Sequence, residues 1–126
     1  MAKNLVLEDV AVNAEADALA LLANNGYIRI KTAADLQLAE LRFGDPAFPA
    51  AAAGVLTANA ITPDAEADNT GVATKYEAYQ SDGTTKLWTG TVGTADADLI
   101  LNSVEIQAGA EVSITSLEHT VPKSAA

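Results

Sequence analysis

The stretch between residues 72 and 114 constrains the fold most, because its side chains alternate in character as those of consecutive β-strands do. Its first eight residues place two sets of side chains on opposite faces: Val72, Thr74, Tyr76 and Ala78 on one, and Ala73, Lys75, Glu77 and Tyr79 on the other. A period of two is typical of a half-buried strand. The stretch therefore predicts successive antiparallel strands joined by short turns.

A tight turn and a return strand follow the first strand. Asp82 can bond its own backbone, and Gly83 adopts a positive φ without a Cβ clash, so this pair predicts the turn. Trp88 on the return strand then lies opposite Tyr76 and Ala78. A cross-strand aromatic pair of this kind stabilises a hairpin by about 0.2–1 kcal/mol.

The composition limits how thick the core can be. Alanine accounts for 27 of the 126 residues, and aromatic residues make up only 5%. Small side chains bury little apolar area each, so we expect the domain to gain stability from an assembly interface. The length fits one domain, and the lack of cysteine excludes disulfides and thiolate metal sites.

The charge balance narrows the choice of partners. A net charge of −10, from 17 acidic and 7 basic residues, disfavours nucleic acid, because phosphate binding needs clustered Lys or Arg. The acidic excess either keeps free subunits apart or matches a basic partner. Glu8 and Asp9 interrupt the first apolar residues before a signal-peptide core can form, and no segment reaches the roughly 18–20 apolar residues of a membrane span. We therefore expect a soluble protein made in a cytoplasm, with no membrane partner.

The N-terminal part predicts one helix. Residues 1–8 alternate weakly and predict an arm or a short strand, whereas the period becomes helical over residues 9–24. We expect Asp9 to cap this helix, and its apolar stripe to comprise Val12, Ala16, Leu19, Leu22 and Ala23. The helix either packs on its own sheet or docks onto a partner. Residues 9–122 then form one domain, followed by a tail at 123–126.

The remaining chain predicts short strands with a turn signal every 8–12 residues. Strands are expected at 27–31, 36–43, 55–61, 72–79, 86–92, 99–106 and 111–121, although residues 39–41 in the second of these fit a helix equally well. Two prolines make residues 44–49 a loop, and residues 63–71 form an exposed acidic loop. This spacing predicts a mainly β protein, namely an antiparallel, jelly-roll-like β-sandwich with one N-terminal α-helix.

Few residues suit catalysis, and we expect no enzymatic activity. His119 is the only histidine and shares a face with Leu117 and Val121, so a packed histidine is favoured over a general base. A small hydrolase built around His119 and the acidic loop is the competing interpretation. Asp96 and Asp98 predict a solvated turn rather than a glycosidase pair.

The acidic loop superficially resembles a calcium site but lacks its ligand pattern. Its candidate oxygen ligands are Asp64, Glu66, Asp68 and Asn69. Calcium takes 6–8 oxygen ligands, and an EF-hand loop also needs a central glycine and a distal bidentate glutamate. We therefore interpret this segment as a solvated loop, and we assign no metal, cofactor or catalytic residue.

Two motifs in the C-terminal half resemble a known family. The first is Tyr-x-Ser-Asp-Gly-Thr-Thr at residues 79–85, and the second is Ile-x-x-Gly-x-x-Val-x-Ile at residues 106–114. With the sequence around them, they are similar to those of small virion structural proteins of tailed bacteriophages. Members of that family have an N-terminal helix similar to residues 13–22 and a strand similar to residues 27–31. The likeness is weak between residues 44 and 70.

The resemblance implies a jelly-roll-like virion component without catalytic residues. For a chain this small and acidic it implies a capsid decoration, or cement, protein on the capsid surface, made in the host bacterial cytoplasm. Its partners would be the major capsid protein and further copies of itself, as a closed dimer or trimer. The residues expected to contact partners are Ala2, Lys3, Asn4, Leu5, Phe48, Pro49, Thr120 and Pro122.

Two other binding functions fit the same residues. The protein belongs in one case to the phage tail, baseplate or fibre, where it binds a host glycan or acts as an adaptor. In the other it is a free-standing carbohydrate-binding module, which needs a row of exposed aromatic rings. Tyr27 and Tyr79 are the candidates for that row.

Overall fold

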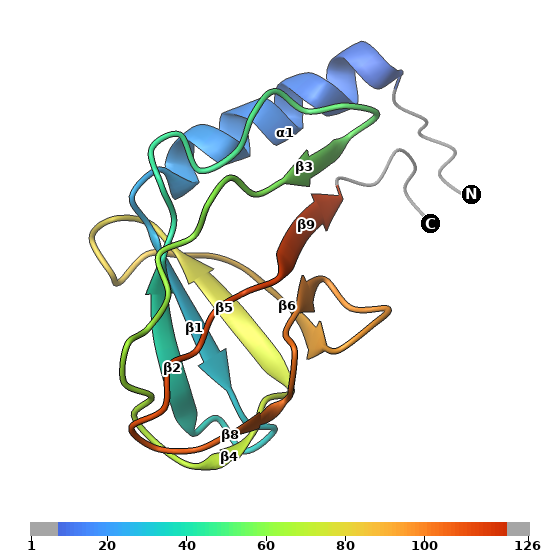
Figure 1. Ribbon diagram of the computed structural model, residues 1–126. Helices are drawn as coiled ribbons and strands as arrows, with labels where there is room; N and C mark the ends of the chain where they lie inside the picture. Colours follow the sequence, from blue (N-terminus) through green and yellow to red (C-terminus); the bar gives the residue numbers. More distant parts are fainter. Residues whose placement is uncertain (1–7, 121–126) are drawn as a thin grey trace, which may run out of the picture.

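A computed structural model of the protein describes residues 8–120 as a mainly β fold with one helix (Figure 1). The elements are α1 (Asp9–Ala23), β1 (Tyr27–Lys31), β2 (Gln37–Arg42), β3 (Val55–Thr57), β4 (Gly71–Val72), β5 (Lys75–Tyr79), β6 (Lys86–Gly93), β7 (Leu99–Ile100), β8 (Glu105–Ile106) and β9 (Ser116–Thr120). The predicted arm at 1–8 falls outside these residues except for Glu8, as does the predicted tail at 123–126. α1 lies across one end of the molecule, next to β3 (Figure 1).

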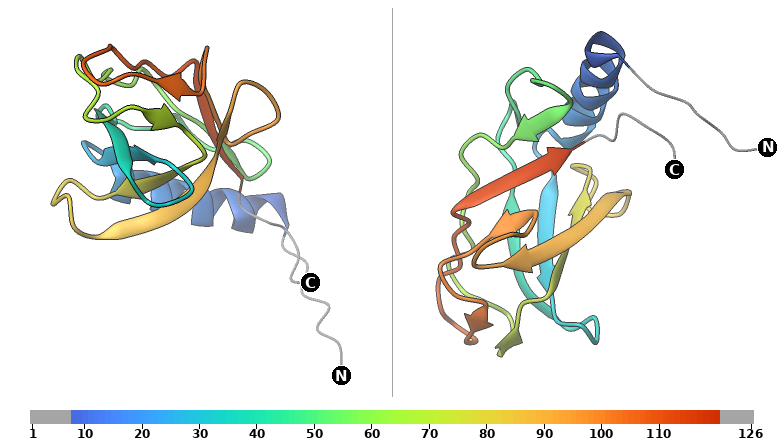
Figure 2. Two further views of the ribbon diagram at one scale, coloured as in Figure 1. Left: turned by 90° about the horizontal axis from the view of Figure 1, so that it is seen from below. Right: turned by 90° about the vertical axis from the view of Figure 1, so that its right-hand side faces the viewer.

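Seven strands form one large mixed sheet in the order β2-β1-β5-β6-β7-β9-β3, and β4 pairs with β8 in a separate ladder. The expectation of a purely antiparallel sheet is wrong at one place, because β6 and β7 run parallel. The five-residue connection between them is held by Asp98, which accepts hydrogen bonds from the backbone N–H and the hydroxyl of Thr91. The right-hand view of Figure 2 shows β6 running from the side of β5 across to the side of β9.

The predicted hairpin is confirmed and forms the centre of the sheet. Ala78 pairs with Trp88, and Tyr76 pairs with Gly90. The Trp88 indole N–H donates a 2.8 Å hydrogen bond to the Tyr76 hydroxyl. Burial raises the pKa of Tyr76 to about 12, so this hydroxyl stays protonated at neutral pH. A Cβ atom on Gly90 would lie 2.5 Å from the Tyr76 ring, which explains why glycine faces the tyrosine.

Trp88 is also the meeting point of distant parts of the chain. Its ring centroid lies 6.2 Å from that of Phe43, 6.3 Å from that of Phe48 and 4.5 Å from that of His119. Phe43 follows β2, Phe48 lies in the next loop, and His119 comes from β9. The half-buried Trp88 ring therefore joins the hairpin to that loop and to β9.

The helix forms as predicted, but its buried face is turned from the predicted stripe. Val12, Ala16, Ala20 and Ala23 are buried, whereas Leu19 is half-buried and Leu22 is 49% exposed. Successive residues lie about 100° apart around a helix, so Leu22 lies well outside the arc from Val12 to Ala23. Glu8, rather than Asp9, occupies the N-cap position, and its side chain makes no capping hydrogen bond.

Several predicted strands differ in extent. Predicted strand 55–61 ends at Thr57, strand 72–79 breaks between β4 and β5, and regions 99–106 and 111–121 contain only the short β7, β8 and β9. The pairing of β1 with β2 skips Leu38, so Leu38 and Ala39 are both buried although they are neighbours. A register irregularity of this kind is not visible in side-chain alternation.

β5 is buried on both faces, which corrects the expectation of a half-buried strand. Glu77 is only 5% exposed, yet it lies on the face turned away from Tyr76 and Ala78. Its carboxylate accepts a 2.7 Å hydrogen bond from the Tyr79 hydroxyl and pairs with Lys31 at 2.8 Å and Lys86 at 3.0 Å. Burial alone would raise the pKa of Glu77, but the hydrogen bonds from these three partners outweigh burial and hold the pKa at about 2.

Substitution of Gly90 by alanine is expected to destabilise the fold by about 1–3 kcal/mol, because the new methyl group would displace the Tyr76 ring from its packed position. A loss of stability would be informative, since replacing Gly by Ala normally stabilises a protein where the backbone allows it. Thr89→Ala, on the exposed face of the same strand, is the matched control and should change stability by much less. Urea denaturation measures both variants, and equal stability of Gly90→Ala and the wild type would contradict the packing described.

Acid is expected to remove the contribution of Glu77. Its pKa is about 2 in the folded protein and near 4.5 in the unfolded chain, so the ionised group stabilises the fold above about pH 4.5 and loses this effect as the pH falls towards 2. Glu77→Gln should cost about 3 kcal/mol at pH 7, because it leaves Lys31 without its buried counter-charge. The difference from wild type should shrink between pH 5 and pH 2 in denaturant titrations. Glu118→Gln, at an exposed position, should show no such convergence.

Candidate docking surface along the helix

The outer face of α1 is unusually apolar for a surface helix. Among its residues whose side chains are described, seven are exposed: Val10, Ala14, Glu15, Asp17, Ala18, Leu21 and Leu22. Five of these seven are apolar, and Val10 and Leu21 are 79% and 72% exposed. The exposed face of an amphipathic surface helix normally carries polar residues. Apolar residues therefore lie on both sides of this helix, although the residues that the structure describes cover only one of them.

A groove borders this exposed face. It has a volume of about 460 Å³ and lies between the C-terminal half of α1 and the loop after β2. Apolar residues make up most of its wall, with Asp17 and Asn24 as the polar members; the others are Ala18, Ala20, Leu21, Pro46, Phe48, Pro49 and Ala50. The groove thus continues the apolar surface of the helix onto a second element.

Three polar side chains of the helix region hold the loop that forms the other wall. Asn13 accepts a hydrogen bond from the backbone N–H of Gly54, Asp17 from that of Ala51, and Asn24 from that of Ala47, each at 2.8 Å. Loop amides that are bonded in this way lose freedom, so the groove has a defined shape without a bound partner.

Sequence reasoning missed this anchoring. Asn13, Asp17 and Asn24 are spaced by four and seven residues, which places them on one side of a helix, next to its buried face. That spacing is the available signal, but it does not reveal which segment the side chains bind. Their partners lie 23 to 41 residues away in the chain.

The structure places some of the predicted contact residues on this surface. Pro49 is exposed at the groove, whereas Phe48 is only 4% exposed and packs its ring against Phe43 and Trp88. Thr120 ends β9 and pairs with Val55 of β3. Ala2, Lys3, Asn4, Leu5 and Pro122 lie outside the described residues. That any of these residues contacts a partner stays a prediction.

His119 packs against the aromatic cluster around Trp88. Its ring lies 4.5 Å from that of Trp88, and burial lowers its pKa, with Asp98 acting in the opposite direction. The imidazole is therefore neutral at pH 7. Its position in the aromatic cluster confirms the expectation of a packed histidine on the face of Leu117, which is also buried.

The acidic loop is largely exposed, as expected, and it also binds the edge of the sheet. Asp64 accepts a hydrogen bond from the backbone N–H of Glu40, and Asp68 accepts one from the Gln37 side chain. Asn69 donates to the Gln37 carbonyl oxygen. Within residues 8–120, no three Asp, Glu or His side chains come together in a group able to hold a metal ion.

The two tyrosines proposed as a glycan platform carry arginines on their rings. The Arg42 guanidinium lies 4.3 Å from the centre of the Tyr27 ring, and that of Arg29 lies 4.4 Å from the centre of the Tyr79 ring. Tyr79 is also 9% exposed. Cation–π stacking therefore occupies ring surface that a sugar would need.

Loss of one anchor is expected to loosen the groove locally. In Asp17→Ala the backbone N–H of Ala51 loses its acceptor, and its hydrogen exchange should become about tenfold faster, which corresponds to roughly 1.4 kcal/mol. Glu15→Ala removes a neighbouring exposed carboxylate that makes no such bond and serves as the control. Exchange followed by mass spectrometry of peptides covering residues 47–54 distinguishes the two variants. Equal protection in both would contradict the anchoring.

Comparison with protein-family models, curated proteins and solved structures finds no match to this chain. A membrane-spanning helix would need about 20 apolar residues, and the part of the chain that the structure describes contains no helix of that length and apolarity. The likeness to small phage virion proteins therefore stays a prediction from the two sequence signatures. In the structure, one forms the end of β5 and the turn that follows, and the other begins in β8.

Proposed function

We propose that this protein is a bacteriophage capsid decoration, or cement, protein that binds the outer surface of the assembled head and stabilises contacts between major capsid proteins. The observation that carries the proposal is the apolar outer face of α1 with its adjoining groove. Exposed apolar surface on both sides of a junction between helix and loop is typical of a protein–protein interface. The two sequence signatures are the reason for proposing that this surface is covered in a virion.

The proposed mechanism is mechanical. Each subunit lies over a junction between major capsid proteins and buries Val10, Leu21 and the rim of the groove against them. A protein that binds the closed shell but not the opened one raises the free energy of opening by RT ln(1 + [L]/Kd) per site, which is about 2.7 kcal/mol at a concentration of 100 Kd. The anchored loop reduces the ordering that binding would otherwise require.

The proposal extends to the body of the protein and to its assembly. We propose that the mixed sheet belongs to a β-sandwich of the jelly-roll type, with α1 as its docking edge. Copies of the protein then associate as a closed dimer or trimer on the virion surface, without catalytic activity. Its many alanines support this view, because a thin core gains from the area that an interface buries.

The decisive test mixes purified protein with expanded capsids of the corresponding phage that lack it. Wild-type protein should co-sediment with these capsids and raise their melting temperature. Leu21→Asp should weaken binding at least tenfold, because it places a charge in the apolar contact.

Leu36→Asp is the matched control, since Leu36 is also exposed but lies in the turn between β1 and β2, away from α1. It should bind as the wild type does. The capsid assignment would be contradicted if the wild type did not co-sediment. It would also be contradicted if quantitative mass spectrometry found a handful of copies per particle instead of hundreds.

A further inference from the structure

The charges of this protein are segregated. Of its seven Lys and Arg residues, two lie outside the described range, and the other five all lie on the outer face of strands β2, β1, β5 and β6: Arg29, Lys31, Arg42, Lys75 and Lys86. We call this set the basic face. Three carboxylates, Asp35, Glu40 and Glu77, pair with these cations, so the five cations of the basic face outnumber the carboxylates paired with them in a protein of net charge −10.

Internal contacts hold the cations of the basic face in place. Glu77 binds two lysines at once, and Arg29 lies between Glu40 and the Tyr79 ring. The Arg42 guanidinium stacks on Tyr27 and donates to a backbone carbonyl oxygen 2.6 Å away. Side chains held in this way lose less rotamer entropy when a partner binds.

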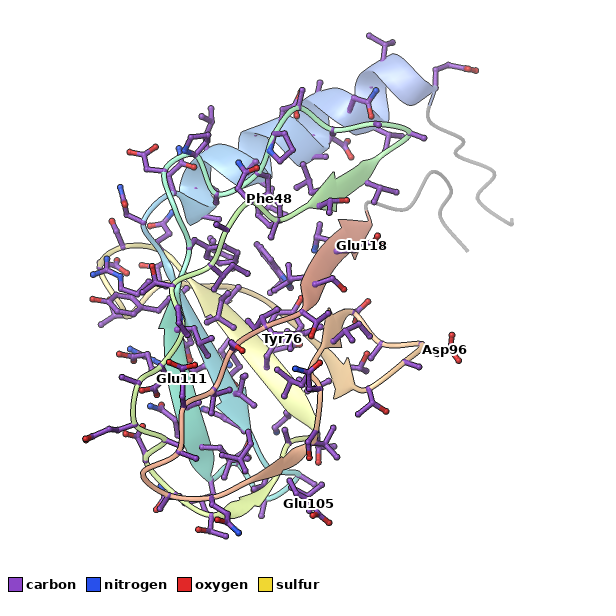
Figure 3. The ribbon with its side chains drawn as sticks, viewed as in Figure 1. Phe48, Tyr76, Asp96, Glu105, Glu111 and Glu118 are labelled. Atoms are coloured by element: carbon purple, nitrogen blue, oxygen red, sulfur yellow. The ribbon has the colours of Figure 1, made fainter. Side chains whose placement is uncertain are left out.

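Among the described residues, the segment on the other side of the molecule from β1 and β5 carries only acidic charge. Residues 94–118, which we call the acidic layer, contain no Lys or Arg and include five exposed carboxylates: Asp96, Asp98, Glu105, Glu111 and Glu118. Figure 3 shows Asp96, Glu105 and Glu118 pointing outward from this layer. Glu105 and Glu111 also line a hollow of about 300 Å³ between β8 and the segment before β9.

We propose that the basic face of one copy binds the acidic layer of a second copy. The hollow between Glu105 and Glu111 of the second copy then receives an Arg or Lys side chain from the basic face of the first. A second copy fits because it carries an acidic layer, which is opposite in charge to the basic face. A contact between two acidic surfaces of copies that each have a net charge of −10 would instead be repulsive. Repulsion between the net charges is screened beyond about 8 Å at physiological ionic strength, whereas charges in contact are not. The local pattern therefore selects the contacting faces.

The contact joins two different surfaces, so it repeats from copy to copy. A heterologous contact of this kind forms a ring if the rotation closes and an open row if it does not. The two surfaces lie on opposite sides of the molecule, and α1 lies across one end (Figures 1 and 2). Copies joined through the basic face and the acidic layer thus leave the apolar surface of α1 free.

Two charge-reversed variants test the pairing on the free protein. The first, Arg42→Glu with Lys75→Glu, alters the basic face at an exposed arginine and at a lysine whose partner, Asp35, is itself exposed. The second, Glu105→Lys with Glu111→Lys, alters the hollow. Each alone should raise the dissociation constant of self-association at least about tenfold in sedimentation velocity at 0.15 M ionic strength.

An equimolar mixture of the two variants should associate again, because the intact basic face of the second variant meets the intact hollow of the first. Glu8→Lys with Glu15→Lys makes the same charge change on α1 and should associate at least as well as the wild type. If the first variant melts at a lower temperature, Arg42→Gln with Lys75→Gln replaces it.

A mixture that stays monomeric would overturn the proposal, as would unchanged association of either variant alone. A wild type that is monomeric at millimolar concentration, while its basic face retards duplex DNA, would also overturn it in favour of a nucleic-acid partner. Because the readout is the mass of the free protein, failure here leaves the result of the capsid experiment unchanged.

Discussion

The hydrogen bond between Trp88 and Tyr76 is the contact on which the rest of the structure depends. It joins the two central strands of the sheet and fixes the indole where Phe43, Phe48 and His119 can pack around it. Phe48 belongs to the loop that walls the groove, and His119 belongs to β9. One cross-strand pair thus sets the position of the docking surface and of the second side of the molecule. A protein with few aromatic residues has gathered four of them, with its histidine, at this point.

The sequence revealed local structure better than it revealed the connections between elements. The central hairpin follows from alternation and turn chemistry, because both depend on neighbours in the chain. The parallel pairing of β6 and β7, the bulge at Leu38 and the early end of β3 depend on partners far along the chain. Burial of Glu77 was hidden for a similar reason, since a carboxylate in an alternating strand looks solvent-facing until its two lysines and its tyrosine are placed around it.

The candidate site was predictable in its ingredients but not in its geometry. Phe48 and Pro49 were singled out from the chain, and Pro49 does lie on the rim of the groove. Phe48 instead fills the aromatic cluster, because a buried ring stabilises more than an exposed one. The anchors at Asn13, Asp17 and Asn24 went unnoticed because polar residues on a helix are normally solvated. Their function becomes visible only when the loop amides lie opposite them.

Small side chains of α1 pack against the rest of the protein, whereas several of its larger apolar side chains lie on the outer face. The buried face holds three alanines and one valine, which lets the helix approach the sheet closely but buries little area. The larger side chains of Val10, Leu21 and Leu22 point the other way. Complete burial of one such side chain stabilises by about 1.5–3 kcal/mol, and most of that energy is unused in the isolated protein. If α1 served only its own sheet, leucine would be expected on its inner face, where it would fill space. Because two of its three leucines, Leu21 and Leu22, lie outside instead, the outer face of this helix keeps apolar surface that the described residues leave exposed.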